Sequence, residues 1–195
     1  MNSAGIDILV RHPVRRRRLT LDQYHRLGEA GILGEDDRVE LLDGQLVDMS
    51  PIGPRHALAV DALNELLGVA VAGRAAIRVQ NPIEIDRGTE PNPDIAVVRR
   101  PWRGYPRTHP RPEDVLLLVE VADSSLETDR GAKLELYARS GIREFWIVDL
   151  RTDGVDVYRG PSGDAYASTV RVGSSGLLDI EALPGIAIPA ASLFA

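Results

Sequence analysis

Glu120 is the residue whose setting points most directly to chemistry. It lies in residues 115–121, where all of the remaining residues are Leu or Val. An ionised carboxylate buried in such a strand without a partner is strongly unfavourable, so Glu120 needs a cation, a hydrogen-bond network or a raised pKa. A buried ion pair with an arginine would meet this need without any catalytic role. The sequence therefore allows two interpretations of Glu120, a site carboxylate and a structural one.

Asp94 is a second carboxylate that could join it. It follows Pro93 and opens the apolar run 94–98, a position where Asp often serves only as a turn residue. If residues 94–98 and 115–121 form adjacent strands, however, Asp94 and Glu120 converge at one place. Paired carboxylates with backbone oxygens are ligands for Mg²⁺ and Mn²⁺.

Lys133 stands out because it is the only lysine among the 23 basic residues. An arginine-rich composition would by itself explain why lysine is rare. Alternatively, the position requires a compact ammonium whose pKa can shift, which a bulkier guanidinium cannot replace. Lys133 and Tyr137 are four residues apart in a predicted helix and so share one side of it. The candidate set is thus two acids and a lysine.

The hydrophobic pattern predicts the elements that must position these residues. Thr20 precedes an apolar stripe that predicts a short helix ending near Gly31, and Asp43-Gly44 is a strong hairpin signal within residues 38–49. Longer helices are expected at 56–72 and at 130–140, the second closed by Gly141. Strands are expected at 76–86 (bent at Pro82), 94–98, 115–121, 145–148, 155–158 and 165–172. From residue 56 the order is α-β-β-β-α-β, which predicts an α/β (α+β) fold with helices packed on a mixed central sheet.

Composition limits the class of protein. The chain has 195 residues, of which 44% are hydrophobic and 27% charged, with a formal net charge of −6 and no Cys. This composition is typical of a globular protein and excludes a disulfide framework, a Cys-based zinc site and a thiol nucleophile. No apolar run approaches the ~18 residues of a membrane span, so we expect a cytoplasmic protein with no membrane association. We also expect residues 1–18 to form a flexible Arg-rich arm and residues 19–195 a single domain.

Three stretches of the sequence, together with His56, resemble one protein family. The stretches are residues 38–51, 93–98 and 119–149, and the ending from Leu183 to Phe194 is similar as well. They resemble the Uma-type putative restriction endonuclease family of the PD-(D/E)XK nuclease superfamily, over nearly the whole chain from about Leu19. The superfamily pattern puts a lysine two residues after the acid that corresponds to Glu120, and this chain has Ala122 at that position. In the Uma-type branch the lysine lies on the following helix, which fits Lys133.

The resemblance implies a restriction-endonuclease-like fold with an α-β-β-β-α-β core and a metal-dependent endonuclease that hydrolyses DNA. Asp94 and Glu120 would bind Mg²⁺ or Mn²⁺ with help from the main-chain carbonyl of Val121. Lys133 would orient or help deprotonate the attacking water and stabilise charge in the transition state. Glu40 matches a family acid that either adds a metal ligand or holds Lys133, although a surface acid of the hairpin is an equal alternative.

Further residues are candidates for contact with the nucleic acid. His56, at the start of the predicted long helix, could contact phosphate, with a helix-cap or packing role as the alternative. Between Ile95 and Pro112, a stretch that joins the two metal-binding strands, the sequence contains no acid, and its basic and aromatic side chains suit a phosphate backbone or unpaired bases. Its candidate contacts are Arg99, Arg100, Trp102, Arg103 and Arg107. A solvated loop or a dimer contact would explain this composition equally well. The resemblance also implies a homodimer.

Two other classes of function remain open. The same fold could serve as a non-catalytic nucleic-acid-binding or mobile-element accessory module, which need not bind a metal. A structural or toxin-type partner protein could instead use the sheet edge for dimerisation. The sequence motifs of P-loop, dinucleotide-binding, zinc-protease and serine-hydrolase enzymes are absent, and the four His residues are scattered, which disfavours a His-based zinc site.

Overall fold

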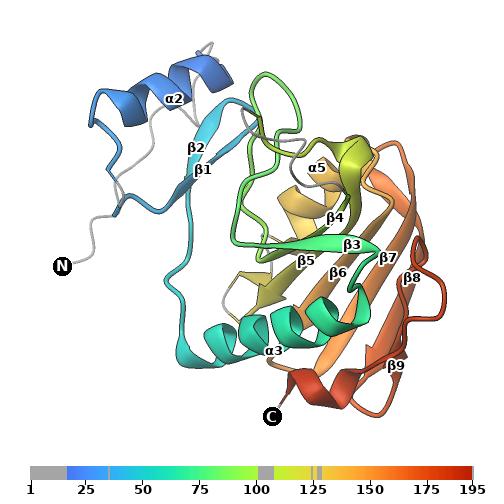
Figure 1. Ribbon diagram of the computed structural model, residues 1–195. Coiled ribbons are helices and arrows are strands. Elements are labelled where there is room, and N and C mark those ends of the chain that lie inside the picture. Colours follow the sequence, from blue (N-terminus) through green and yellow to red (C-terminus); the bar gives the residue numbers. More distant parts are fainter. Residues whose placement is uncertain (1–16, 35, 101–107, 124, 127–128, 195) are drawn as a thin grey trace.

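The computed structural model describes residues 17–34, 36–100, 108–123, 125–126 and 129–194, so residues 1–16 of the predicted arm lie outside the described residues. The centre of the fold is a six-stranded sheet with the strand order β3-β4-β5-β6-β7-β8 (Figure 1). Its strands are β3 (Ala75–Val79), β4 (Ile95–Arg99), β5 (Val115–Ala122), β6 (Glu144–Asp149), β7 (Gly154–Ser162) and β8 (Ala165–Gly173). The main helices are α2 (Leu21–Glu29), α3 (Pro54–Ala70) and α5 (Leu134–Arg139).

The central sheet is mixed because one of its strand pairs is parallel. Neighbouring strands are antiparallel except for β5 and β6. All eight residues of β5 are buried, as its unbroken apolar pattern predicts for a strand covered on both faces. A parallel pair needs a crossover connection, and here that connection contains a π-helix, Asp129–Lys133, followed directly by α5. The crossover thus brings Lys133 back over the sheet.

The two faces of the sheet pack against different helices. Val119 belongs to the core that contains Leu63 of α3, whereas Leu118 belongs to the core that contains Tyr137 of α5. Since successive side chains along a strand point to opposite faces, Glu120 lies on the same face as Leu118. The strand pattern therefore directs Glu120 towards the crossover that carries Lys133.

A separate two-stranded sheet consists of β1 (Val39–Leu42) and β2 (Gln45–Asp48). Its turn residues Asp43 and Gly44 have φ angles of 50° and 74°, as a two-residue type I′ turn requires. A bridge between Leu41 and Glu90 joins this hairpin to the segment that precedes β4. The predicted hairpin is thus confirmed, and it is attached to the chain near the site residues.

The first and last described segments pack on different parts of the molecule. Thr20 precedes α2, as the sequence predicts, and forms a capping box with Gln23. The helix lies beside the β1–β2 hairpin (Figure 1). The C-terminal segment packs into the core beneath α3. Its elements are β9 (Leu177–Leu178), β10 (Ile188–Pro189) and the 3₁₀ helix η4 (Ala190–Leu193); a further 3₁₀ turn, η2 (Pro112–Asp114), precedes β5. None of the helices in the described ranges has both the length and the apolarity to cross a membrane.

The predicted order α-β-β-β-α-β is confirmed, but two elements differ from the prediction. The strand expected over residues 76–86 ends at Val79, because Gln80 has a φ of 48° and residues 80–93 form a loop rather than a strand. The helix expected over 130–140 begins as a π-helix, which the apolar pattern cannot distinguish from an α-helix. It is followed at Gly141 by a φ of 79°, as expected of a glycine after a helix end.

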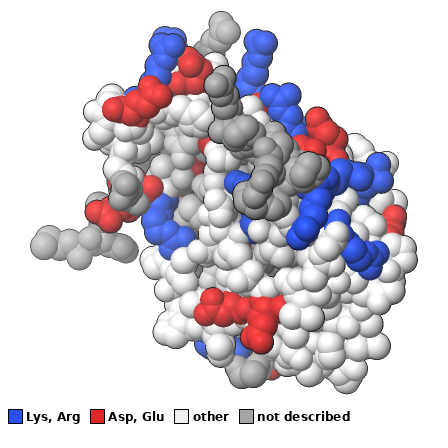
Figure 2. Space-filling model, viewed as in Figure 1, with Lys and Arg blue, Asp and Glu red and all other residues white. Residues whose placement is uncertain are grey.

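Charges of both signs occur on the face shown in Figure 2. Basic side chains lie mainly in the upper half of this view, and an acidic group lies over α3, where Asp61 and Glu65 are exposed. The visible face is therefore not a uniform basic surface of the kind that would bind DNA by charge alone.

Candidate functional site

Asp94, Glu120, Lys133 and Glu40 line one cavity of about 190 Å³. Each of the four is between 3% and 7% exposed. The antiparallel pairing of Ile95 with Val119 places the start of β4 beside the end of β5, which is why Asp94 and Glu120 converge as the sequence predicts. The other charged or polar side chains of the wall are Arg38, Asp48, Ser50, His56, Asn92, Asp123, Ser125 and Asp129.

Lys133 lies between two carboxylates. Its Nζ is 3.0 Å from Oε1 of Glu120 and 3.2 Å from Oε1 of Glu40. Burial lowers the pKa of the Lys133 ammonium, but the negative charges of Glu120 and Glu40 outweigh burial and raise that pKa above its ordinary value. The amine is therefore a fixed cation at the centre of the site.

One carboxylate oxygen of Glu120 accepts hydrogen bonds from described residues, and the other accepts none from them. The hydroxyl of Tyr137 donates a hydrogen bond of 2.8 Å to the same Oε1 that Lys133 contacts. Among the described residues, no hydrogen bond to Oε2 is found. Burial raises the pKa of Glu120 to about 8, against the opposing effect of Lys133, and the nearby acids Asp129, Asp94 and Glu40 raise it further.

Asp94 is held in its ionised form by three donors. Its Oδ2 accepts the backbone N–H of Val121 at 2.8 Å and lies 3.0 Å from Nε2 of His56, while its Oδ1 accepts Nε2 of Gln80 at 3.1 Å. Burial raises the pKa of Asp94, but His56 and the other donors outweigh burial, so the pKa lies below its ordinary value. The environments of Asp94 and Glu120 therefore push the pKa values of two neighbouring carboxyls apart, a common arrangement in active sites.

His56 and Glu40 are also part of this site. The hydrogen bond to Asp94 raises the pKa of His56 above its ordinary value although burial lowers it, and Nδ1 of His56 is buried without a partner among the described residues. Glu40 is 3% exposed, and its Oε2 accepts the backbone N–H of Asn92 at 3.1 Å. A buried position between Lys133 and Asn92 is not that of a surface hairpin acid.

Sequence reasoning missed two side chains that support the site. Asp129 lines the cavity, is 2% exposed and accepts a hydrogen bond of 2.6 Å from the hydroxyl of Ser125; burial raises its pKa. Its position four residues before Lys133 is a signal that could have identified it. Gln80 gives no such signal, because its contact with Asp94 depends on the left-handed backbone that ends β3.

Of the predicted nucleic-acid contacts in the loop after β4, the two that the structure describes, Arg99 and Arg100, do not line the cavity. Arg99 ends β4, five residues from Asp94, and donates from Nε to the carbonyl of Glu113 at 3.0 Å. Arg100 donates from Nε to the carbonyl of Ala75 at 2.9 Å. The remaining contacts, Trp102, Arg103 and Arg107, lie outside the described residues.

The arrangement combines a fixed ammonium, an ionised carboxylate and a carboxyl with a raised pKa. Such a set can bind and orient an anionic, phosphate-containing substrate and can position a water molecule beside it. Within the described residues, no group of three or more His, Asp or Glu side chains is arranged to hold a metal ion by itself. Any metal bound here would therefore need ligands in addition to side chains of these types.

The fold and the sequence were compared with those of known proteins. The fold is similar to the crystal structure of "a putative nuclease belonging to DUF820 from Anabaena variabilis ATCC 29413", with a TM-score of 0.70 and 16% sequence identity, covering 90% of this chain and 97% of that one. No curated protein matches the sequence. The model of the family described as "Uma2: Putative restriction endonuclease" matches residues 21–191. The chain therefore belongs to the Uma2 family.

Proposed function

We propose that this protein is a Mg²⁺- or Mn²⁺-dependent endonuclease that hydrolyses phosphodiester bonds of DNA. The observation that carries the proposal is Lys133, buried between Glu120 and Glu40 in the cavity that also contains Asp94. Family membership supports a nuclease as the class of enzyme. DNA as the substrate, the metal and the roles of individual residues are our proposals.

The charge of the cavity fits a divalent cation. Among the described residues, six carboxylates and two permanently cationic side chains line it, so the wall carries an excess of negative charge. Oδ1 of Asp94 accepts one hydrogen bond and Oε2 of Glu120 accepts none from described residues, so both carboxylates retain free lone pairs. In a strand the N–H and C=O of one residue point to the same side, and the N–H of Val121 points to Asp94. Asp94, Glu120 and the carbonyl of Val121 would therefore hold the metal.

When bound, the metal would polarise the scissile phosphate and lower the pKa of a water molecule. Lys133 would orient that water and stabilise the negative charge that develops on the phosphate oxygens. Glu40 and Glu120 keep the ammonium in place, and Tyr137 fixes the shared oxygen of Glu120. His56 and Gln80 hold the carboxylate of Asp94 in one orientation.

Cleavage assays with purified variants test this proposal. We expect the wild-type protein to nick plasmid or single-stranded DNA with Mn²⁺ or Mg²⁺, and Glu120→Gln and Lys133→Met to lose at least ~100-fold in rate, the scale seen when one charge-stabilising group is removed. Glu65→Gln, at an exposed position on α3, is the matched control and should cleave as the wild type does. Equal rates for all four proteins would mean that the nicking comes from a contaminant, and the proposal of an endonuclease would fail.

A further inference from the structure

A second cavity, of about 350 Å³, lies on the other side of β1 from the candidate active site. Glu40 lines the first cavity and its neighbour Val39 lines the second, as expected because adjacent strand residues point to opposite faces. The volume is within the ~300–1,000 Å³ typical of small-molecule sites. The cavity is lined by Tyr24, His25, Gly28, Leu33, Gly34, Asp37, Val39, Glu90 and His109.

Glu90 supplies an unused hydrogen-bond acceptor in the wall of this cavity. It is 4% exposed, and its Oε1 lies 2.9 Å from Nε2 of His25. Its Oε2 is buried and has no hydrogen-bond partner among the described residues. Leaving a buried carboxylate oxygen unpaired is costly, so a donor brought by a ligand would be stabilised here. The side chain of His25 is 47% exposed and can move to admit one.

Aromatic rings form another part of the wall. The hydroxyl of Tyr24 donates to the carbonyl of Val39 at 3.1 Å, which fixes the ring. The ring of His25 lies 5.8 Å from it, tilted by 43°. Nucleic-acid-binding proteins commonly stack unpaired bases on such side chains.

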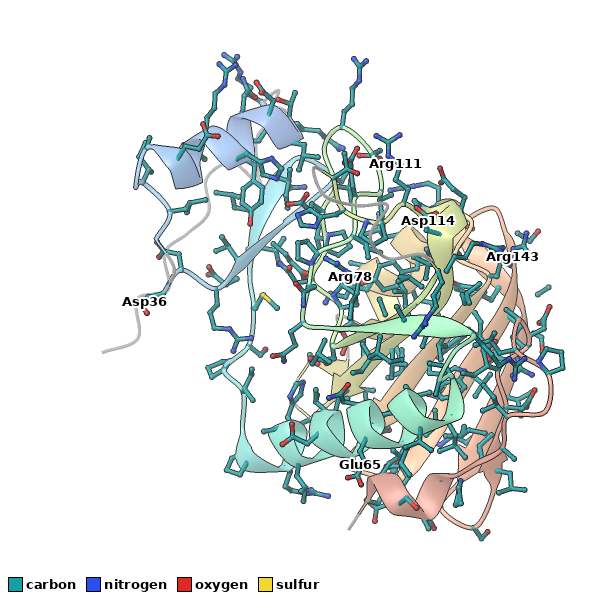
Figure 3. The ribbon with its side chains drawn as sticks, in the orientation of Figure 1. Asp36, Glu65, Arg78, Arg111, Asp114 and Arg143 are labelled. Atoms are coloured by element: carbon teal, nitrogen blue, oxygen red, sulfur yellow. The ribbon has the colours of Figure 1, made fainter. Side chains whose placement is uncertain are left out.

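His109 adds a hydrogen-bond donor. Its Nδ1 lies 3.4 Å from the guanidinium of Arg78 (labelled in Figure 3), which can only donate, so the proton of the neutral ring is on Nε2. Burial lowers the pKa of His109 below its ordinary value, and this favours the neutral ring. The wall therefore offers a carboxylate acceptor and an imidazole N–H, a pair that complements the edge of a base with an exocyclic amino group.

The same side chains disfavour other ligands. Glu90 and Asp37 make the wall acidic, which opposes binding of phosphate. His25, His109 and Glu90 do not form a metal-holding group, since the described residues contain none of three or more such side chains. A neutral aromatic ring with polar edges can stack on the rings of Tyr24 and His25 and donate a hydrogen bond to Glu90.

We propose that this second cavity binds an unpaired nucleobase that carries an exocyclic amino group, with Tyr24 as the stacking surface and Glu90 as the acceptor. The inference rests on the proposed function, because it assigns this cavity to the recognition of bases in the substrate of the nuclease. The cavity lies on the opposite side of β1 from the candidate active site. A free nucleoside and a base within a strand present the same chemistry to this cavity. The test therefore includes both ligands and distinguishes between them.

The test measures binding to Lys133→Met protein without added metal, so that no cleavage occurs. The probes are single-stranded oligonucleotides with one central 2-aminopurine or, for comparison, a purine that lacks the amino group. We expect quenching of the 2-aminopurine fluorescence and about tenfold tighter binding of the amino-bearing strand, the scale of one good base contact. Glu90→Leu, which removes the acceptor, should abolish this preference, and Tyr24→Leu or His25→Ala should weaken binding of both strands.

Glu84→Leu is the matched control, because Glu84 lies near Glu90 in the chain but pairs with Arg111 and does not line the cavity. It should behave as the parent protein does. Free 2-aminopurine riboside that binds as tightly as the strand would identify a free nucleoside as the ligand. Equal affinity for the two strands, or a preference that survives Glu90→Leu, would overturn the proposal. So would displacement of the probe by an Arg-rich peptide at a lower concentration than the unlabelled amino-bearing strand needs. Cleavage by the wild-type protein is measured separately, so a failure of this proposal can be distinguished from a failure of the proposed function.

Discussion

At the scale of residues, the candidate site depends on one ammonium between two carboxylates. Lys133→Met leaves Glu40 and Glu120 close together without a cation, and breaking a buried ion pair typically costs ~3–5 kcal/mol. We expect a loss of about 3 kcal/mol in the free energy of unfolding, measured by urea denaturation of metal-free protein. Lys133→Arg, which keeps the charge, should lose less stability but should not restore cleavage, because a guanidinium is larger. A change below ~1 kcal/mol in Lys133→Met would contradict a tightly held pair.

Tyr137 gives a milder prediction at the same scale. Tyr137→Phe removes the hydroxyl that donates to Glu120 and keeps the ring that packs on Phe145. The expected loss of stability is about 1 kcal/mol, the net value of one hydrogen bond. Cleavage should fall less than in Lys133→Met, because Tyr137 positions Glu120 and does not contact the reacting groups. A variant as inactive as Lys133→Met would argue for a direct role of the hydroxyl.

The sequence predicted the residues of the site that are anomalous in type. Glu120 is an acid in a Leu/Val strand and Lys133 is the only lysine, so each could be recognised without knowledge of the fold. Two partners of Asp94 could not be recognised, because Gln80 reaches it from a left-handed turn and the N–H of Val121 reaches it from the end of a strand. Such contacts are set by the backbone, which side-chain patterns do not encode.

At the scale of elements, the position of Lys133 depends on how the crossover after β5 is fixed. Arg130 in the π-helix pairs with Asp156 of β7 at 2.6 Å and with Asp149 of β6 at 3.4 Å. Hydrogen bonds from Thr152 and Arg151, with nearby arginine charges, lower the pKa of Asp149 although burial raises it. The helical pattern predicted the crossover, whereas the π-helix and these contacts between distant strands were not predictable from local periodicity.

The lowered pKa of Asp149 predicts how the stability of the folded protein changes at acidic pH. Because the pKa of Asp149 is lowered in the folded protein, its ionised form contributes stability above the ordinary value of 3.8, and that contribution is lost as the pH falls through the folded pKa. Asp149→Asn should therefore be less stable than the wild type at pH 7, and the difference should narrow below pH ~4. Denaturation curves at pH 7 and pH 3 measure this. Asp164→Asn, in the exposed turn between β7 and β8, is the control and should show no such narrowing.

At the scale of the whole molecule, the proposed metal should stabilise the fold. A ligand that binds only the native state at 100 times its Kd adds about 2.7 kcal/mol. We expect Mn²⁺ to raise the melting temperature of the wild-type protein and to have little effect on Asp94→Asn, which loses a proposed ligand. An equal shift for both proteins would place the metal elsewhere. The homodimer stays a prediction, and the mass in solution, measured with and without DNA, tests it.

The parallel pairing of β5 with β6 has a consequence for how the chain folds. β6, β7 and β8 are consecutive antiparallel strands with local contacts, whereas β5 meets β6 only after the chain between Ala122 and Glu144 has closed into a loop. Non-local pairings form more slowly than local ones. We therefore expect the three-strand meander to form early in a newly made chain, while Asp94, Glu120 and Lys133 are still apart in water. The candidate active site would therefore assemble only in the last steps of folding.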